Sequence, residues 1–326
     1  MRRVHPMRLY LPLTCILLLV LPACGFARAS QPTPLPTVTL PLDPTATRTP
    51  FLPGGLAPSL TPTSEIPLPA ESLPRPAGQV CILLLGSDQR PGRSDFRTDV
   101  ILLLSLRADG SLALVSFPRD LYLYLPGRGT NRINTAFEYG GFELLAETLD
   151  YNFGLRPDRY VLTNFDSFMS IVDSLGGVDV NVAQELSDAR TGYPEGFTVN
   201  PGLVHMDGET ALWYVRSRET TTDFDRLRRA QEVLAAIGGK LFSLQALAHI
   251  PDLYQAYRSL VVTDLSLEDL LDLLPVLEAV DSNRVDHYTI VPPVVAPWIH
   301  PDTGAYYLLP DTNAIRAILQ QAIGTP

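Results

Sequence analysis

The chain has 326 residues, of which 46% are hydrophobic and 18% charged, and its formal net charge at pH 7 is −10. This length and composition suit one large or two small globular domains and exclude a chain that is disordered throughout. The negative charge argues against a nucleic-acid partner, because affinity for duplexes depends on a basic surface that neutralises phosphates.

The first residues predict a secretory signal. Residues 1–24 carry three arginines within the first eight positions, continue with an apolar run and end in LPAC, which Gly25 follows. The run is short for a membrane span and has the order of a signal peptide. Its ending resembles a bacterial lipobox, in which Cys24 would be lipidated. An ordinary cleaved signal and an uncleaved membrane anchor are the alternatives, and each places the protein at the cell envelope.

Residues 25–78 predict a spacer. The stretch 31–76 holds 13 of the 30 prolines, together with many Thr and Ser residues. Such a segment cannot sustain a helix or a central strand, and it favours a semi-rigid extended or disordered chain. We therefore expect one folded domain, over residues 79–326.

Three apolar runs open this domain. Residues 79–86, 98–106 and 111–117 are predicted strands joined by short connections, the second of which contains the turn sequence Asp109-Gly110. Short connections favour an antiparallel meander. Cys81 lies inside the first run and is expected to be a small buried residue.

After the meander, the pattern alternates between helices and strands. Asp207 opens one predicted helix, and Ser266 with Asp269 resembles a capping box at the start of another. The sum predicts an α/β fold: a single domain with a central mixed, largely antiparallel sheet flanked by helices. The predicted helices are 140–154, 166–177, 207–215, 225–247, 266–280 and 312–323, and the predicted strands are 158–165, 178–182 and 285–294.

The meander brings polar residues to one edge of the sheet, because the end of one antiparallel strand lies beside the start of the next. Asp88 follows the first strand, Asp99 opens the second, and Arg119 and Asp120 follow the third. Two aspartates at one edge could share Mg²⁺, which favours one or two carboxylates plus waters and phosphate oxygens. The alternative is that each aspartate forms a turn or a cap.

The stretch 213–234, WYVRSRETTTDFDRLRRAQEVL, is densely cationic. Arg216 and Arg218 are two residues apart, so they can face one ligand only if a helix ends near Arg216 and the chain becomes extended. Arg226 and Arg229 share a face of the next helix, and Arg228 points elsewhere. Arginine suits phosphate because its donors are planar and bidentate. Surface ion pairs with nearby acidic residues are the alternative.

These segments together resemble the LytR-CpsA-Psr family of envelope phosphotransferases. The resemblance covers about residues 80–234, with the less distinctive remainder fitting as a C-terminal part. Seven motifs follow one another in the family's order: ILLLGSD, RTDVILLLSL, LVSFPRD, NRINTAFEYGG, FDSFMSIVDSLGGVDVNV, MDGETALWYVRSR and DFDRLRRAQEVL.

The resemblance implies an α/β domain that transfers a phospho-glycan from a polyprenyl-pyrophosphate carrier to peptidoglycan, at the outer face of the cytoplasmic membrane. It implies Mg²⁺, with Mn²⁺ possible, at Asp88 and Asp99. It also implies a polyprenyl groove formed in part by helices 141–154 and 165–175. The residues expected to line the pyrophosphate site are Arg97, Arg119, Asp120, Asn134, Arg216, Arg218, Arg226, Arg229 and Gln231, of which Arg119, Asp120, Arg216 and Arg218 are expected to act in the transfer.

Two other functions remain open at this point. The same pocket could serve a polyprenyl-phosphate binder or regulator without catalysis, or a pyrophosphatase that acts on the lipid carrier.

Overall fold

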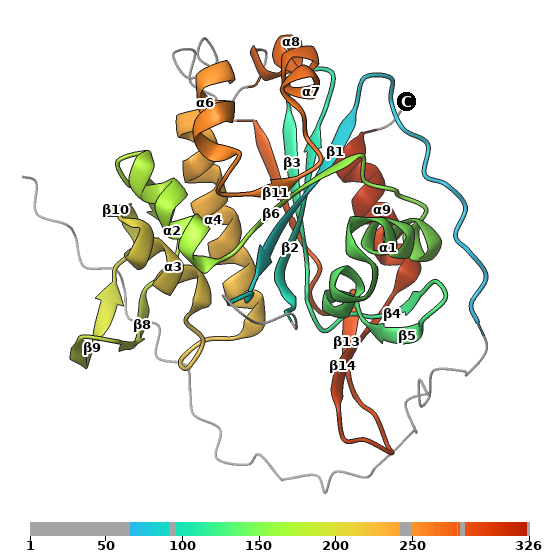
Figure 1. The fold of residues 1–326 in the computed structure, drawn as a ribbon. Coiled ribbons are helices and arrows are strands. Elements are labelled where there is room, and N and C mark those ends of the chain that lie inside the picture. The colour runs from blue at the N-terminus through green and yellow to red at the C-terminus, as the bar shows by residue number, and fades with distance from the viewer. Residues whose placement is uncertain (1–65, 91–95, 242–249, 279, 281–283, 325–326) are drawn as a thin grey trace, which may run out of the picture. The chain divides into compact units, whose positions relative to one another are not determined.

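A six-stranded mixed sheet lies within the residues that the computed structural model describes, which are 66–90, 96–241, 250–278, 280 and 284–324 (Figure 1). In spatial order its strands are β11 (Val262–Thr263), β6 (Arg159–Thr163), β1 (Val80–Ser87), β2 (Thr98–Leu106), β3 (Leu112–Phe117) and β12 (Val285–Thr289). The predicted meander β1–β2–β3 is antiparallel, whereas β6 runs parallel to β1 and β12 runs parallel to β3. The predicted α/β fold with a mixed, largely antiparallel sheet is confirmed.

Helices cover both faces of this sheet (Figure 1). On one face lie α1 (Ala136–Phe153) and α9 (Thr312–Ile323), whose apolar residues share a core with β1, β2 and β3. The helices on the other face are α2 (Phe165–Ser174), α3 (Gly208–Arg216), α4 (Asp223–Leu241), α6 (Ile250–Tyr257), α7 (Leu267–Asp272) and α8 (Leu274–Glu278).

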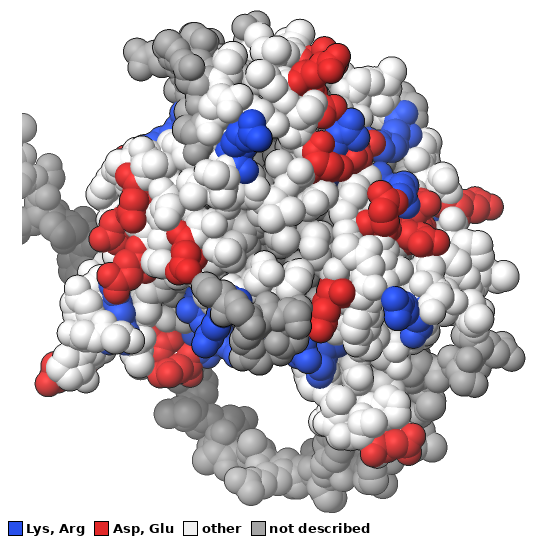
Figure 2. Space-filling model, viewed as in Figure 1, with Lys and Arg blue, Asp and Glu red and all other residues white. Residues whose placement is uncertain are grey.

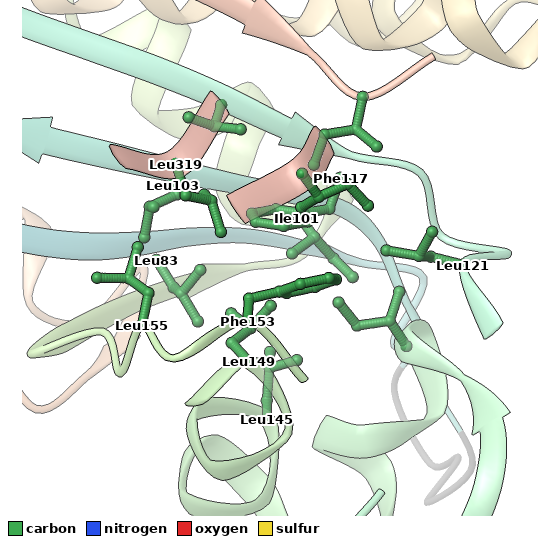
Figure 3. Packing of buried hydrophobic residues seen from close by; sticks show 14 of the residues in the cluster. Leu83, Ile101, Leu103, Phe117, Leu121, Leu145, Leu149, Phe153, Leu155 and Leu319 are labelled. Atoms are coloured by element: carbon green, nitrogen blue, oxygen red, sulfur yellow. The ribbon is translucent and has the colours of Figure 1, made fainter. Parts of the chain in front are cut away.

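The core on the α1 and α9 side is closely packed (Figure 3). Successive strand residues point to opposite faces, so the odd-numbered residues of β1 and β2 face α1 and α9. Leu83, Leu103, Leu149, Phe153 and Leu319 are each at most 2% exposed. Burying a side chain of this size contributes about 1.5–3 kcal/mol, and this face therefore supplies much of the stability of the domain.

Four two-stranded sheets complete the described part of the chain. Only one of their strands, 178–182, was predicted. Two of the missed strands carry residues that weaken the strand pattern: Pro297 lies inside β13 (Val295–Ile299), and Pro194 and Gly196 lie inside β9 (Tyr193–Val199). The four pairs are β4 (Tyr122–Leu125) with β5 (Gly129–Arg132), β7 (Val178–Val182) with β10 (Gly202–Met206), β8 (Leu186–Arg190) with β9 (Tyr193–Val199), and β13 (Val295–Ile299) with β14 (Tyr306–Pro310).

The predicted helix starts agree with the structure at two caps and differ at one helix. The Asp207 side chain accepts a 2.8 Å hydrogen bond from the backbone of Thr210, and Ser266 forms the predicted capping box with Asp269. By contrast, α1 begins at Ala136, before the predicted start at 140. Gly140 and Gly141 form a non-helical kink inside it rather than its start.

The folded unit extends before residue 79, the predicted domain start. Leu73 is 9% exposed and belongs to the core, and its backbone N–H donates a 2.7 Å hydrogen bond to the carbonyl of Gly154. The guanidinium of Arg316 donates to the carbonyl of Glu71 at 2.7 Å. The predicted signal peptide with Cys24, the spacer up to residue 65, and the predicted helical residues 242–247 lie outside the described residues. Within the described part, we find no helix with the length and apolar character needed to cross a membrane.

Candidate functional site

The end of β1, the start of β2 and the segment after β3 meet at one edge of the sheet. A carboxylate oxygen of Asp99 in β2 lies 2.9 Å from Nη1 of Arg119. The carboxylate of Asp88 accepts a 2.7 Å hydrogen bond from the backbone N–H of Arg97, just before β2. The prediction that Asp88, Asp99 and Arg119 share an edge is confirmed.

The chain changes direction between Arg216 and Arg218. Helix α3 ends at Arg216, and Ser217 has extended backbone angles (φ −56°, ψ 137°). The predicted condition for both arginines to face one ligand is therefore met. The guanidinium of Arg216 lies over the ring of Phe165, 4.0 Å from its centroid, which orients the cation without neutralising it.

Asp223, at the start of α4, is shared by three arginines. Its carboxylate oxygens lie 3.4 Å from Nε of Arg119, 3.5 Å from Nη1 of Arg218 and 3.6 Å from Nη2 of Arg226. Arg226 also donates a 3.3 Å hydrogen bond to the carbonyl of Asp99. Arginines from three segments of the chain therefore converge on one carboxylate, and Arg119 also pairs with Asp99 and Asp120.

Two arginines at this edge have a lowered pKa: Arg226, which is buried, and Arg216, which is partly desolvated although it is exposed. Burial lowers the pKa of Arg226, which is only 6% exposed, and the carboxylate of Asp223 offsets this in part. Partial desolvation, followed by the charge of Arg90, lowers the pKa of Arg216. The Nε atoms of Arg119 and Arg226 are buried and have no hydrogen-bond partner among the described residues. A bound anion would stabilise the charged form of these arginines and would offer hydrogen-bond acceptors to their guanidinium groups.

A cavity of about 520 Å³ opens at this arginine cluster. Its mouth is lined by Asp99, Arg119, Arg216, Arg218 and Arg226. Its interior runs between the sheet and the helices of the second face, and apolar side chains form most of its wall. Residues from five elements illustrate that wall: Leu84 in β1, Leu102 in β2, Phe168 in α2, Ile237 in α4 and Tyr254 in α6. A cavity with an apolar interior and a cationic mouth suits an amphiphilic anion.

One side of α4 lines the cavity along its length. Arg226, Ala230, Val233, Ile237 and Leu241 all contribute to the wall. Their spacing of three or four residues places them on one helix face. The spacing of this stripe is visible in the sequence, but spacing alone does not show whether a helix face borders a closed core or a groove.

Of the two helices predicted to form the groove, one does so. Phe165, Phe168 and Ile171 of α2 line the cavity. The prediction for helix 141–154 is wrong, because the apolar side of α1 packs on the opposite face of the sheet, where Leu145 and Phe153 are fully buried in the core (Figure 3).

Two predicted site residues form internal contacts and do not line the cavity. Arg229 is 1% exposed, and its guanidinium donates to the carbonyl of Ser217 and, at 3.0 Å, to the hydroxyl of Thr221. It thereby holds the loop that carries Arg218. The amide of Gln231 donates to the hydroxyl of Ser116 at 2.6 Å and to the carbonyl of Tyr288 at 2.8 Å, which fastens α4 to the sheet.

Three further predicted residues lie around the cluster without lining the cavity. Asp120 pairs with Nε of Arg132 at 2.9 Å and with Nε of Arg119 at 3.5 Å. Asn134 is 2% exposed, and its amide oxygen has no hydrogen-bond partner in the described part of the chain. Arg97 is exposed and contributes its backbone N–H to Asp88.

Arg228 lies apart from the cluster, as predicted. Its guanidinium pairs with the carboxylate of Glu232, which also accepts a 2.6 Å hydrogen bond from the hydroxyl of Tyr214. This arginine therefore has an acidic partner of its own on α4.

The chemistry of Asp88 and Asp99 fits a divalent cation. Asp99 lines the cavity, and Asp88 lies at the same edge of the sheet, where it accepts a hydrogen bond from the backbone of Arg97. No group of three or more metal-binding side chains occurs among the described residues. Mg²⁺ is commonly held by one or two carboxylates, with waters and substrate phosphates completing its shell, so two aspartates at one edge of the sheet fit such a site.

This chain is similar to several curated proteins over part of the length of each. The chain is 33% identical over 204 residues to the polyisoprenyl-teichoic acid–peptidoglycan teichoic acid transferase TagU of Oceanobacillus iheyensis, with 60% of this chain and 62% of that protein covered. It is 31% identical over 192 residues to the regulatory protein MsrR of Staphylococcus aureus, covering 58% and 57%. The chain thus spans about three fifths of the length of these relatives. TagT of Bacillus subtilis is 31% identical over 221 residues, covering 65% and 69%.

Solved structures and the family's sequence model agree with this match. The crystal structure of B. subtilis TagV has a TM-score of 0.63 and 25% identity, covering 76% of this chain and 98% of that chain. A structure of TagT bound to LIIa-WTA has a TM-score of 0.59 and 26% identity, covering 76% and 91%. The LytR_cpsA_psr model matches residues 62–323. The resemblance predicted from the motifs is confirmed, and the chain belongs to the LytR_cpsA_psr family.

Proposed function

We propose that this protein transfers a phospho-glycan from a polyprenyl-pyrophosphate carrier to peptidoglycan and forms a phosphodiester link. The observation that carries the proposal is the cavity, whose apolar interior ends at a mouth lined by four arginines. A long apolar chain joined to a pyrophosphate has the same two-part chemistry. The similarity to TagU and TagT, both named as polyisoprenyl-teichoic acid–peptidoglycan teichoic acid transferases, supports this reaction class.

The apolar interior would hold the carrier lipid. Each buried CH₂ group contributes about 0.8 kcal/mol, so a few isoprene units inside the cavity would bind firmly. The lipid would then fix the position of its pyrophosphate at Arg216, Arg218 and Arg226. The binding energy of this remote part of the substrate would orient the reacting phosphorus.

In the proposed reaction, a hydroxyl oxygen of the acceptor attacks the phosphorus nearer the glycan. A new P–O bond forms to the acceptor, and the bond from that phosphorus to the bridging oxygen breaks. Polyprenyl phosphate leaves with the electron pair of the broken bond. The arginines of the mouth stabilise the charge that grows on the leaving phosphate and on the non-bridging oxygens.

We assign the proton of the acceptor hydroxyl to Asp120. This carboxylate lies beside Arg119 and Arg132 at distances of 3.5 and 2.9 Å. Phosphoryl transfer through a loose transition state needs little help from a base, so a carboxylate at this position suffices. Asp120→Asn should therefore reduce kcat by about 10- to 100-fold.

We further propose that Asp88 and Asp99 hold Mg²⁺, for which Mn²⁺ could substitute. When bound, the ion would neutralise charge on phosphate oxygens beside Arg216. Chelation should abolish transfer, and added Mg²⁺ should restore it. Full activity of a metal-stripped sample would contradict the assignment.

The proposed location is the outer face of the cytoplasmic membrane, with lipidation at Cys24 as the anchor. The carrier lipid lies in that membrane, so an anchored enzyme would meet its substrate there. Mass spectrometry of the membrane-bound protein should find an acylated Cys24 at its N-terminus. An unmodified N-terminus elsewhere in the chain would contradict lipidation.

The similarity to MsrR, which is named a regulatory protein, supports a second candidate: a carrier-lipid binder or regulator that does not catalyse transfer. A pyrophosphatase acting on the carrier is a third. The three differ in their products, because only the transferase needs an acceptor and only the binder leaves the pyrophosphate intact.

The deciding experiment incubates the purified full chain with a radiolabelled lipid-linked glycan, Mg²⁺ and peptidoglycan. The proposal expects label in peptidoglycan that detergent does not remove and that mild acid releases. Free phospho-glycan formed without acceptor would identify a pyrophosphatase instead. Tight binding of polyprenyl phosphate with no product across several acceptors would identify a binder.

The distribution of charge on the surface argues against a nucleic-acid partner. On the face seen in Figure 2, basic and acidic side chains are interspersed around a neutral centre rather than gathered in one basic patch. Such a surface does not favour a nucleic acid, and we propose none as a partner.

A further inference from the structure

A hairpin outside the motif region lies close to the arginine cluster. Strands β13 and β14 project from the domain beside β4 and β5 (Figure 1). The backbone N–H of Leu308 in β14 donates a 2.9 Å hydrogen bond to the carbonyl of Asp120. The hairpin is thus joined directly to the residue to which we assign the acceptor proton.

A second connection runs through Arg132. Its guanidinium donates a 2.8 Å hydrogen bond to the carbonyl of Tyr306, pairs with the carboxylate of Asp120 at 2.9 Å, and lies over the ring of Tyr307, 4.9 Å from its centroid. One cation therefore fixes the position of β14 relative to Asp120.

The two faces of the hairpin differ. On one, Trp298 and Tyr307 are cross-strand partners with ring centroids 5.8 Å apart, and Tyr122 of β4 packs against both rings. On the other, Ile299 and Tyr306 are cross-strand partners that remain 64% and 43% exposed. The packed face stiffens the hairpin, whereas the exposed pair is free to contact a ligand.

The Tyr306 hydroxyl is affected by two carboxylates near the arginine cluster. Partial burial, and then the carboxylates of Asp120 and Asp223, raise the pKa of the Tyr306 hydroxyl. Asp223 is the carboxylate shared by the arginines of the cavity mouth. Tyr306 is partly exposed and is connected to Asp120 through Arg132, which contacts both residues.

The chemistry of this pair suits a sugar. The C–H groups of a pyranose face are attracted to the negative face of an aromatic ring, and an aliphatic side chain extends the apolar contact. The hydroxyl rim of the sugar remains free to bond with the phenol and with water. Residues 295–310 contain no Lys or Arg, and Asp302 is their one acidic residue. The hairpin therefore suits a glycan with few charges better than a densely anionic polymer.

We propose that Ile299 and Tyr306 form the subsite for the acceptor, on which a sugar ring of the peptidoglycan glycan strand packs and presents its hydroxyl toward Asp120. This inference rests on the proposed transferase function, because it divides the site between two substrates. The donor occupies the cavity and its arginine mouth, and the acceptor occupies the hairpin.

The test compares the full-length wild type with Tyr306→Ala, Tyr306→Phe and the control Tyr193→Ala, which removes a tyrosine of similar exposure (45%) from another hairpin. The affinity for a peptidoglycan tetrasaccharide without stem peptides is measured by calorimetry. Tyr306→Ala should weaken binding by about tenfold or more, and Tyr306→Phe, which keeps the ring, by less than about threefold. Tyr193→Ala should bind as the wild type does.

Measurements with the donor substrate show whether a variant affects only the acceptor. Affinity for the lipid-linked glycan should be the same in all four proteins. A donor affinity that falls in Tyr306→Ala while tetrasaccharide binding holds would overturn the acceptor assignment. Absence of tetrasaccharide binding to the wild type, or equal binding to Tyr306→Ala, would overturn it as well. If Tyr306→Ala does not fold, Ile299→Ser replaces it with the same expectation.

The failure of the subsite and the failure of the transferase function are distinguishable. Tetrasaccharide binding that depends on Tyr306, without any transfer, would reject the reaction and retain the subsite. Transfer by Tyr306→Ala with an unchanged KM for the acceptor would retain the reaction and reject the subsite.

Discussion

On one face of the central sheet, Leu83 and Leu103 pack against Phe153 and are at most 1% exposed (Figure 3). On the other face, their chain neighbours Leu84 and Leu102 border a cavity of about 520 Å³. The same strands, with leucine on both faces, thus build a closed core and an open binding space. The difference arises from what covers each face: α1 and α9 fill the first, whereas α2, α4 and α6 stand around the second.

This difference separates stability from function. Protein cores are packed to crystal-like density, and leaving a void of this size costs stability. The arginines at its mouth add a further cost, because desolvation lowers the pKa of Arg226 and Arg216. A face that is destabilising when empty gains free energy when an apolar chain with an anionic head binds to it.

The largest expected effect comes from the mouth of the cavity. Arg218→Ala should lower kcat/KM for transfer by about 10³-fold, because arginines that stabilise a transferring phosphoryl group contribute at least this much. Arg284→Ala is the matched control: its side chain is 54% exposed, against 50% for Arg218, and it lies at the opposite end of the sheet. Steady-state kinetics of both variants checks this. Similar losses in the two would contradict the role of the mouth.

Paired leucine substitutions test the two faces directly. Leu103→Ala, on the packed face, should lower the free energy of unfolding by about 3 kcal/mol. Leu102→Ala, on the cavity face, should cost about 1 kcal/mol, because part of its surroundings is already empty and fewer contacts are lost. Urea titrations of the apoprotein measure both values. Equal costs would show that the second face is as closely packed as the first.

A larger side chain in the cavity should reduce lipid binding without reducing the stability of the protein. Ala230→Phe places a ring in the cavity, and it should reduce the affinity for polyprenyl phosphate by about tenfold while leaving the melting temperature near that of the wild type. Ala322→Phe, at a fully buried position of α9, should instead destabilise by about 1–3 kcal/mol through overpacking. Calorimetry measures the affinity for polyprenyl phosphate, and thermal melts measure the stability of both variants. An Ala230→Phe protein that is destabilised but still binds the lipid with wild-type affinity would contradict an open cavity at this position.

The smallest effect concerns thiol reactivity. Burial raises the pKa of Cys81, on the packed face, to about 11. At pH 8, below that value, about one thiol in a thousand is ionised, so Cys81 should resist alkylation in the native protein and react after unfolding. A cysteine introduced on the cavity face, Leu84→Cys, should react in the native protein. Peptide mass spectrometry after iodoacetamide distinguishes the two, and rapid native labelling of Cys81 would contradict close packing.

The sequence allowed prediction of the elements that carry strong local signals. The apolar runs of β1, β2 and β3 and their short connections predicted the meander, and the meander in turn predicted that Asp88, Asp99 and Arg119 share an edge. The break after Arg216 was also foreseeable, because two arginines at this spacing cannot share a helix face. These inferences rest on how side-chain direction repeats, about every two residues in a strand and every 3.6 residues in a helix.

The remainder depended on tertiary contacts. Leucine on both strand faces does not reveal which face will be filled, so the groove was assigned in part to α1 instead of to α4 and α6. Helical spacing placed Arg229 near the site, but it could not show that Ser217 and Thr221 occupy its donors. The hairpin with Trp298 and Tyr306 was missed because Pro297 interrupts the strand pattern.

The most direct test of the account is photo-crosslinking with a polyprenyl phosphate that carries a diazirine at the far end of its chain. We predict that mass spectrometry will find the crosslinks on the cavity face, at residues of α2, α4 and α6 such as Ile171, Ile237 and Tyr254, and that Ala230→Phe will suppress them. Crosslinks on α1 or α9, or labelling that Ala230→Phe leaves unchanged, would contradict the claim that one face of the sheet is open to hold the lipid.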